Sequence, residues 1–354
     1  MIKRFIVAYN KSFYFMYMAN IAIAGATGAV GQEILNSLAK KEFPVNELKL
    51  FSSSRSAGNT QATSFGPYIL EEFSIEACKN IDIIFFAVGG DFSRKYASEL
   101  LEKNDKIIII DNSSAFRYDK NIPLVVPAIN ASAIKNSRLI ANPNCTTAIL
   151  AMVLHPIYKE FGLKKCIVST YQATSGAGNP GMQELLHESK NYIDGLPVEN
   201  KIFSHPIPFN LIPHIDVEQE NHYTKEEMKV TWETHKIFED DSFPLSCTAV
   251  RVPIIRAHSE SVVIETKKNI TENGGLEKVR EILINAVGVT LRDDIQNNNY
   301  PMPLNASEID EVQVGRIRKN LVFGDFGLEF FVCGDQLLRG AALNAVEIAE
   351  LVKI

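Results

Sequence analysis

The segment IAIAGATGAVG at residues 21–31 constrains the fold more than any other part of the chain. Ile21–Ala24 is an apolar run that predicts a buried strand, and Val30–Lys41 has the spacing of an amphipathic helix. The intervening glycines allow a tight turn and a close approach of phosphate to the free N–H groups of the helix N-terminus. This order predicts a dinucleotide-binding unit. The GxxGxxG spacing leaves a close-packed turn without a ligand as the alternative.

The same alternation continues over residues 18–145. A second amphipathic helix is predicted at Phe92–Lys103. Five more short apolar runs predict strands, at Leu48–Phe51, Ile81–Val88, Ile107–Asp111, Leu124–Val126 and Leu139–Ala141. Apolar strands separated by helices are typical of a parallel sheet that is covered on both faces. We therefore expect a Rossmann-like, doubly wound α/β domain.

The pattern changes after residue 145. Thr146–Phe161 reads as one long helix and Cys166–Gln172 as a strand; the three further strands expected are Leu245–Ile255, Ser261–Thr266 and Leu328–Val332. Residues 146–332 therefore predict a second α+β domain built on a mixed or antiparallel sheet. The apolar helix predicted at Leu337–Val352 is expected to return to the first domain, so that residues 333–354 complete it.

Composition narrows the function. The 354 residues are enough for two domains, and 36 Lys and Arg against 42 Asp and Glu give a net charge of −6. No broad basic surface follows, so nucleic-acid binding is not expected. The five cysteines are scattered and form no CxxC pair, which predicts free thiols in a reducing, cytoplasmic compartment and no metal site.

Residues 1–17, MIKRFIVAYNKSFYFMY, are basic and aromatic. The run is too short and too broken for a membrane span, and no cleavage site for a signal peptide follows it. We interpret it as a disordered or misassigned extension, with Met18 as the natural start, and expect no membrane association.

The second predicted strand indicates which dinucleotide is bound. NAD-binding folds place an acidic residue about 20 residues after the glycine turn, to hold the ribose 2′-hydroxyl. Here the strand runs into SSSRSAG at 52–58, where hydroxyl groups and the Arg55 guanidinium suit a 2′-phosphate. NADP is predicted; a solvated arginine in a polar loop is the alternative.

Cys145 is the candidate nucleophile, because NPNCTT at 142–147 places it where a strand ends and a helix begins. The helix N-terminus is expected to lower the pKa of its thiol and to supply N–H groups for an oxyanion. The other four cysteines, in apolar or strand contexts, are expected to be buried and inert: Cys78, Cys166, Cys247 and Cys333. A thiolate beside a nicotinamide suggests hydride transfer at a thioester or hemithioacetal, with a base among the seven histidines. Spacing alone favours a structural or solvated role for His258 over a catalytic one.

Eleven blocks in collinear order resemble the aspartate-β-semialdehyde dehydrogenase family. They are GATGAVG (25–31), SSRSAG (53–58), DNSSAFR (111–117), IPLVVP (122–127), NPNCTT (142–147), STYQATSGAG (169–178), NLIPHID (210–216), YTKEEMK (223–229), ETHKI (233–237), VRVPIIRAHSES (250–261) and GDQLLRGAALNAVEIAE (334–350). The resemblance implies NADPH-dependent reductive dephosphorylation of β-aspartyl phosphate through a cysteine thioester, in lysine, threonine and methionine biosynthesis. It also implies a homodimer.

The resemblance also assigns roles. Cys145 matches the nucleophile, His258 the acid/base and Gln172 the residue that positions the substrate. Arg251 matches the partner of the substrate α-carboxylate and Glu226 that of the amino group, while Arg117, Lys229 and Asn144 match the acyl-phosphate site. The matches to NADP contacts are Thr27, Gly28, Ala29, Val30, Arg55, Ser56, Ser175, Gly176 and Gln336.

Alternative functions stay open. N-acetyl-γ-glutamyl-phosphate reductase and the phosphorylating glyceraldehyde-3-phosphate dehydrogenase share the cysteine chemistry, and a non-catalytic NADP-binding sensor could keep the fold. The EEMK block and the spacing of RVPIIRAHSES argue against the first two, and the complete residue set argues against the third.

One geometric expectation follows from spacing. Arg251 and His258 are an odd number of residues apart, so on one unbroken strand they would face opposite sides of the sheet. If both reach one site, the strand must be interrupted between them, with Pro253 and the small Ala257 as the expected places.

Overall fold

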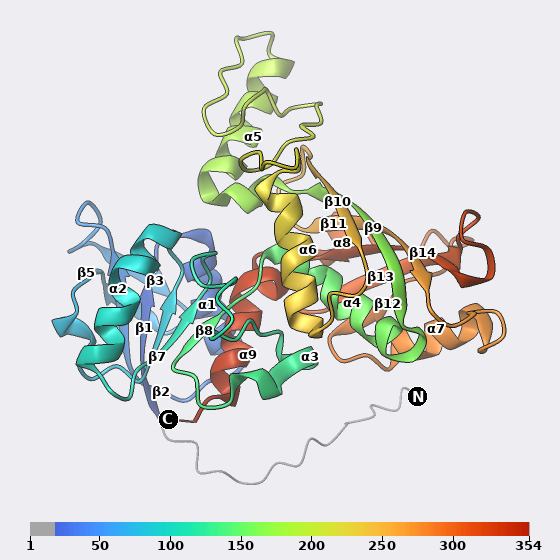
Figure 1. Ribbon diagram of the computed structural model, residues 1–354. Helices are drawn as coiled ribbons and strands as arrows, with labels where there is room; N and C mark the ends of the chain where they lie inside the picture. Colours follow the sequence, from blue (N-terminus) through green and yellow to red (C-terminus); the bar gives the residue numbers. More distant parts are fainter. Residues whose placement is uncertain (1–17, 354) are drawn as a thin grey trace, which may run out of the picture.

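The first domain is built on a six-stranded parallel sheet in the order β5-β2-β1-β6-β7-β8 (Figure 1). The computed structural model describes residues 18–353, so the predicted extension at 1–17 lies outside the described residues. The strands are β1 (Ala19–Ala24), β2 (Val45–Ser52), β5 (Glu71–Glu72), β6 (Ile83–Phe86), β7 (Ile108–Asp111) and β8 (Leu139–Ala141). Helices α1 (Ala29–Lys40) and α2 (Gly90–Lys103) connect them, and a hairpin of β3 (Thr60–Thr63) and β4 (Gly66–Ile69) lies beside the sheet. The predicted Rossmann-like domain is confirmed.

The glycine turn between β1 and α1 is sterically required. Gly25 has φ +86°, and a Cβ there would lie 2.3 Å from the carbonyl oxygen of Ala87. A Cβ on Gly31 would lie 2.3 Å from the carbonyl oxygen of Gly25. A Cβ on Gly28, the N-cap of α1, would lie 3.3 Å from the carbonyl oxygen of Gly25. No side chain caps this helix. The first turn of α1 therefore presents free N–H groups.

The second domain is a mixed sheet in the order β10-β9-β11-β14-β13-β12, as predicted. Its strands are β9 (Leu163–Gln172), β10 (Leu245–Arg251), β11 (His258–Thr266), β12 (Val289–Leu291), β13 (Val312–Lys319) and β14 (Gly327–Gly334). Three helices contribute to the core on one face of the sheet, α4 (Cys145–Phe161), α6 (Lys225–Phe238) and α7 (Gly275–Ile284). The short helices α3 (Pro127–Asn130) and α8 (Pro303–Ala306) lie in connections, and α5 (Gly178–Ile193) projects from the body of the molecule (Figure 1).

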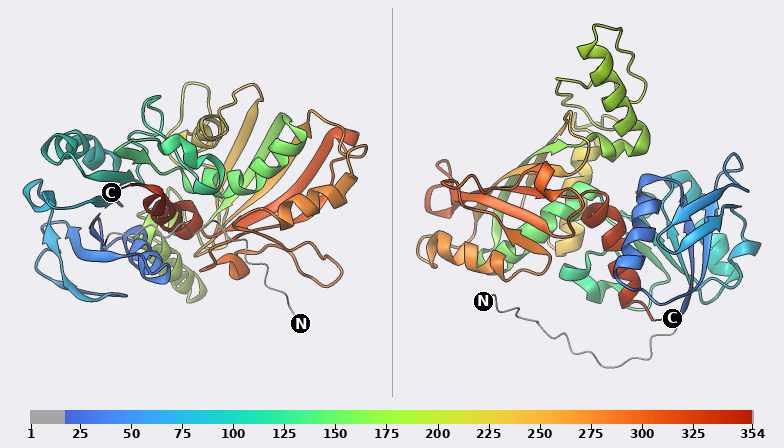
Figure 2. Two further views of the ribbon diagram at one scale, coloured as in Figure 1. Left: turned by 90° about the horizontal axis from the view of Figure 1, so that it is seen from below. Right: turned by 180° about the vertical axis from the view of Figure 1, so that it is seen from behind.

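The chain returns to the first domain at its C-terminal end. Helix α9 (Leu343–Leu351) packs against α1, and its apolar residues join the core of the parallel sheet (Figure 2). The helix predicted at Leu337–Val352 is not one continuous α-helix, because residues 338–342 form a turn of π-helix, called the π-turn below. In this turn Gly340 approaches Cys145 so closely that a Cβ would lie 2.6 Å from the Cβ of Cys145. A π-turn of this kind is often found beside a functional site.

Two predicted strands are corrected. In Leu124–Val126 only Leu124 forms an isolated bridge, because prolines on both sides of the segment limit the pairing. The strand expected to reach Ile255 ends at Arg251, two residues before Pro253, and the next strand begins at His258. The expected interruption between Arg251 and His258 is therefore confirmed.

Gly31→Ala tests the close packing of the glycine turn. We expect the free energy of unfolding to fall by about 1–3 kcal/mol, because the new methyl group overlaps the backbone of the turn. Gly89→Ala is the matched control, since a Cβ at Gly89 meets no atom within 4 Å. Urea denaturation of both variants measures the difference, and equal stabilities would contradict the steric explanation.

Candidate active site

A cavity of about 460 Å³ lies where the two domains meet, at the carboxyl edge of the parallel sheet. This edge is where open α/β sheets bind ligands. Many of the predicted site residues line the cavity, namely Val30, Arg117, Asn144, Cys145, Gln172, Ser175, Gly176, Glu226, Lys229, Arg251 and Gln336. Residues far apart in the sequence are therefore brought together in one site.

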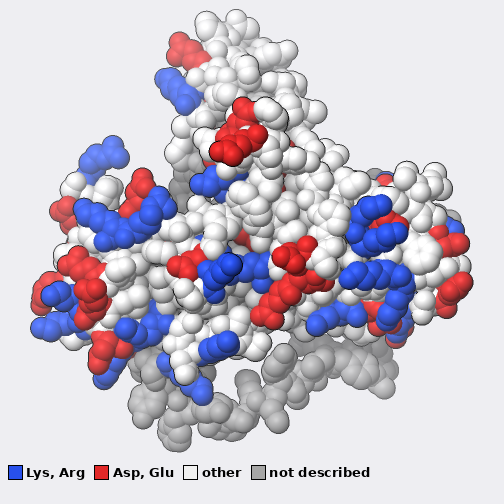
Figure 3. Space-filling view, in the orientation of Figure 1, with Lys and Arg blue, Asp and Glu red and all other residues white. Residues whose placement is uncertain are grey.

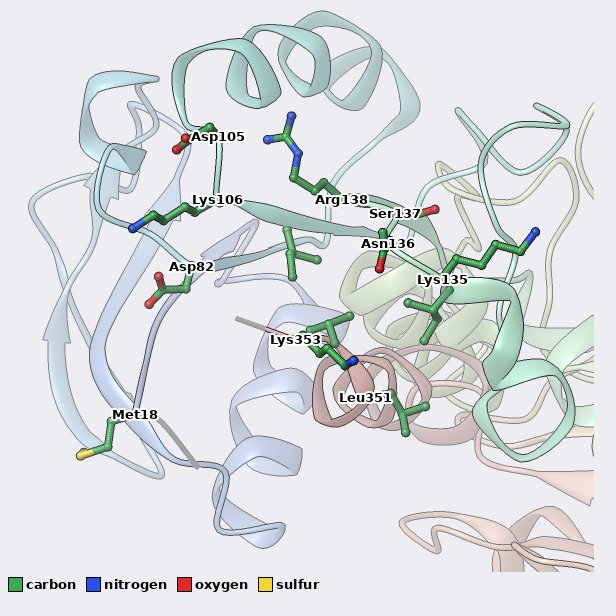
Figure 4. A pocket seen from close by; sticks show the side chains of 13 residues that line it. Met18, Asp82, Asp105, Lys106, Lys135, Asn136, Ser137, Arg138, Leu351 and Lys353 are labelled. Atoms are coloured by element: carbon green, nitrogen blue, oxygen red, sulfur yellow. The ribbon is translucent and has the colours of Figure 1, made fainter. Parts of the chain in front are cut away.

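A larger hollow of about 680 Å³ lies at the opposite edge of the same sheet (Figure 4). It is lined by residues that precede or begin strands, including Asp82, Lys106 and Arg138. The glycine turn and Cys145 are absent from its lining. We therefore place the chemistry in the smaller cavity.

Cys145 is the first residue of α4, and the residue before it caps the helix. The Asn144 side-chain oxygen accepts hydrogen bonds from the N–H groups of Thr146 (3.0 Å) and Thr147 (3.2 Å). The sequence predicted that N–H groups of this helix N-terminus would bind an oxyanion. The N–H groups of Thr146 and Thr147 are not available for that purpose, because they already donate to Asn144. Within the described residues, the N–H of Cys145 itself keeps no protein partner.

The expected lowering of the pKa of Cys145 is wrong for this state of the protein. Burial, together with the nearby Glu226 carboxylate, raises the pKa of the thiol to about 11, although Arg117 and Arg251 act in the opposite direction. Cys145 nevertheless remains partly exposed in the cavity, whereas the other four cysteines are buried free thiols, as expected.

Glu226 on α6 is the centre of a buried hydrogen-bond cluster. Its carboxylate accepts hydrogen bonds from the amides of Asn144 (3.0 Å) and Gln172 (3.1 Å) and from the Lys229 ammonium (2.9 Å). Burial alone raises the pKa of Glu226, but Lys229 and the two amides lower it to about 2. This carboxylate is therefore ionised at neutral pH, and it fixes the side chains around Cys145.

Arg251 and His258 converge on the Ala173 peptide group; Arg251 lines the cavity, whereas the fully buried His258 does not. The Ala173 peptide group binds both side chains: its carbonyl accepts from Arg251 Nη1 (2.6 Å), and its N–H donates to His258 Nδ1 (3.0 Å). A Cβ on Gly176 would lie 2.7 Å from Arg251 Nη1 and 3.3 Å from His258 Cε1. The strand break lets both side chains reach Gly176. It includes Ala257, which has φ +72°, a conformation that favours glycine.

The protonation state of His258 follows from its surroundings. Burial and the Arg251 charge lower the pKa of its imidazole to about 3, so the ring is neutral at pH 7. Because Nδ1 accepts a hydrogen bond, the neutral ring carries its proton on Nε2. That nitrogen is buried and has no protein partner among the described residues.

Glu233 is a site residue that sequence reasoning missed. Its fully buried carboxylate accepts from Arg117 Nη1 (3.1 Å) and from the backbone N–H of Asn144 (2.5 Å). Burial raises the pKa of Glu233, while Arg117 and the Asn144 N–H oppose that rise. Glu226 and Glu233 are two helical turns apart on α6, which is the signal that could have identified it.

The predicted cofactor residues lie in three places. Thr27 and Gly28 precede α1, which begins with Ala29 and Val30, and Val30 also lines the cavity together with Ser175, Gly176 and Gln336. The side chain of Gln336 donates to Ser175 Oγ and accepts from the N–H of Ala257 (2.8 Å). Arg55 and Ser56 follow β2, beside the glycine turn, and Arg55 is exposed and does not line the cavity.

Alkylation of Cys145 tests the raised pKa of its thiol. Well below the pKa the thiolate fraction increases about tenfold per pH unit, so the rate with iodoacetamide should rise from pH 7 to 9 without a plateau. Peptide mapping distinguishes Cys145 from the four buried cysteines. A plateau below pH 8 would show that the helix N-terminus dominates after all.

Comparisons with known proteins agree with this geometry. The family described as "Semialdehyde dehydrogenase, NAD binding domain" matches residues 20–137, and "Semialdehyde dehydrogenase, dimerisation domain" matches 154–339. Aspartate-semialdehyde dehydrogenase of Aquifex aeolicus is 45% identical, covering 94% of this chain and 97% of its own length; that of Bacillus subtilis is 43% identical, with the same shares covered. The crystal structure of aspartate semialdehyde dehydrogenase II from Vibrio cholerae, complexed with ASA, is 40% identical with a TM-score of 0.88, covering 94% of this chain and 98% of that one. The chain therefore belongs to the aspartate-semialdehyde dehydrogenase family.

Proposed function

We propose that the protein reduces L-aspartyl-4-phosphate to L-aspartate-4-semialdehyde and phosphate with NADPH, through a thioester on Cys145. The observation that carries this proposal is the cavity itself. It holds one partly exposed thiol among a buried carboxylate and three cations. The names of the relatives support the same substrate.

The charges of the cavity match the groups of this substrate. Both Glu226 and Arg251 line the cavity; Glu226 would bind the ammonium group and Arg251 the α-carboxylate, a bidentate task for a guanidinium. The phosphoryl group is assigned to Arg117 and Lys229; Arg117 Nε is buried and has no partner within residues 18–353. The Asn144 side chain, engaged with α4 and Glu226, supports the site from behind rather than binding phosphate directly. An N-acetylated substrate would bring no ammonium to Glu226, which favours the aspartyl compound over N-acetyl-γ-glutamyl phosphate.

The residues around Cys145 define the chemical steps. The Cys145 sulfur, as thiolate, attacks the acyl carbon; the bond from that carbon to the phosphate oxygen then breaks, and phosphate leaves. A substrate ammonium on Glu226 offsets one cause of the high pKa of the thiol. When bound, the reduced nicotinamide supplies the hydride that converts the thioester to the aldehyde level. Breaking the carbon–sulfur bond then releases the semialdehyde and restores the thiolate.

His258 serves this sequence as a donor. Its Nε2–H is available to the oxyanion that forms at the acyl carbon, together with the N–H of Cys145. In the reverse direction the same N–H would donate a hydrogen bond to the hemithioacetal oxygen. The neutral ring and its fixed tautomer therefore suit hydrogen-bond donation, whereas a role as proton acid would require the ring to be protonated first.

NADP is the proposed cofactor. The free N–H groups at the start of α1 fit a pyrophosphate, and no carboxylate stands in the Ser52–Gly58 loop to select a free 2′-hydroxyl. The exposed Arg55 guanidinium in this loop would bind a 2′-phosphate.

A homodimer is the proposed assembly, as the description of the dimerisation domain suggests. The face of the mixed sheet opposite α4 exposes Ile167, which is 48% exposed, and carries the aromatic pair Tyr171 and Phe331. A second copy would bury this apolar face.

Surface charge and the free thiols bear on two further parts of the proposal, namely the partners of the protein and its cellular compartment. Positive and negative side chains are interspersed on the face drawn in Figure 3, and we propose no nucleic-acid partner. No helix in residues 18–353 is long and apolar enough to cross a membrane. The free cysteines support the proposed cytoplasmic location.

The reverse reaction tests the proposed function. NADPH should form from L-aspartate-4-semialdehyde and NADP only when phosphate is present, and Cys145→Ser should retain NADP binding while losing turnover. A serine hydroxyl is almost wholly protonated, so kcat should fall below about a tenth of the wild-type value. Cys78→Ser, in the core of the first domain, is the control and should stay active. Phosphate-independent turnover, or an active Cys145→Ser enzyme, would refute the thioester route.

Arg55→Ala tests the cofactor preference. We expect the KM for NADP to rise more than the KM for NAD, because the proposed role of the lost guanidinium is to bind the 2′-phosphate that NAD lacks. Lys79→Ala, which removes an exposed cation from the same domain, should change neither value. Equal effects of Arg55→Ala on both cofactors would show that this loop does not read the phosphate.

A further inference from the structure

The loop that joins α5 to α6 holds two cations of the active site. The ring of Phe203 lies against Arg251, with 5.7 Å from its centroid to the guanidinium carbon. Asp216, from the same loop, accepts a hydrogen bond from Lys229 at 2.7 Å. Both contacts border a hollow of about 250 Å³ that adjoins the main cavity and shares Arg251 and Asp216 with it.

The position of Phe203 is fixed by α5. The carboxylate of Glu184 accepts three consecutive backbone N–H groups, from Lys201 (2.9 Å), Ile202 (2.7 Å) and Phe203 (3.0 Å). The ring also packs on Gly181, where a Cβ would lie 3.1 Å from Cζ of Phe203. The aromatic ring is therefore anchored on two sides before it meets the guanidinium.

An aromatic partner suits the task of Arg251. Among residues 18–353 no carboxylate forms an ion pair with this guanidinium, and its Nη1 donates only to the Ala173 carbonyl. A ring face attracts the cation through its quadrupole and does not occupy the in-plane N–H groups. Those groups stay free for a planar, bidentate partner.

We propose that Phe203 is a positioning residue that sets specificity for substrates bearing an α-carboxylate, by holding Arg251 in place for that group. This inference rests on the proposed function. Phe203 itself need not touch the reacting atoms. Its replacement should weaken recognition of the carboxylate and leave the chemistry at Cys145 intact.

Two aldehydes separate these effects in the phosphate- and NADP-dependent assay. L-Aspartate-4-semialdehyde carries the α-carboxylate, whereas 3-aminopropanal keeps the ammonium and aldehyde without it. In Phe203→Leu the KM for the semialdehyde should rise about fivefold or more, with kcat changed less than about twofold. For 3-aminopropanal, which lacks the carboxylate, the KM should not change. If its turnover is too slow to measure a KM, its inhibition constant against the semialdehyde is measured instead and should not change either.

Three further variants complete the test. Phe203→Tyr keeps the ring and should restore the wild-type KM, and Phe203→Met replaces Phe203→Leu if the latter does not fold. Phe209→Leu is the matched control, because this aromatic residue of the same loop is 69% exposed and packs its ring on Tyr192. Equal losses for both aldehydes, or no loss for either, would overturn the proposal. A wild-type enzyme that is inactive with the semialdehyde would instead refute the proposed function.

Discussion

The buried charge of Glu226 is the constraint on which the site depends. A carboxylate withdrawn from water is tolerated only when charges and hydrogen bonds compensate its lost hydration. Here the compensation comes from Lys229 one turn further along α6, from Gln172 at the end of β9 and from Asn144 at the start of α4. Three elements of the fold are thereby fixed to one carboxylate, directly beside Cys145.

Burial, together with the balance of charge around Cys145, explains why its thiol is not ionised. Arg117, Lys229 and Arg251 bring three formal positive charges, and their effect is offset by the carboxylates Glu226, Glu233 and Asp216. A thiolate would add an uncompensated charge to a largely desolvated cavity, so its pKa rises instead of falling. The helix N-terminus alone therefore does not produce a thiolate at Cys145.

The parts of this picture that depend on local pattern were predictable from the sequence. The glycine turn, the parallel strands and the helix beginning at Cys145 follow from apolar spacing and turn chemistry. The break between Arg251 and His258 followed from their odd spacing and from Pro253. Glu233, Phe203 and the tautomer of His258 did not, because they depend on contacts between distant segments. Glu233 meets Asn144 across 89 positions, and the N–H of Ala173 meets His258 across 85.

A second long-range contact links the cofactor helix to the strand that carries His258. Arg256, within the break before His258, binds Glu33 on α1 at 2.8 Å and the buried Asp335 at 2.6 Å. Asp335 in turn accepts the N–H groups of Leu337 and Leu338, at the start of the π-turn that packs on Cys145. Because one guanidinium joins these three segments, α1 cannot move relative to the β11 start without breaking a partly buried ion pair. The fold thus couples the position of α1 to that of the histidine.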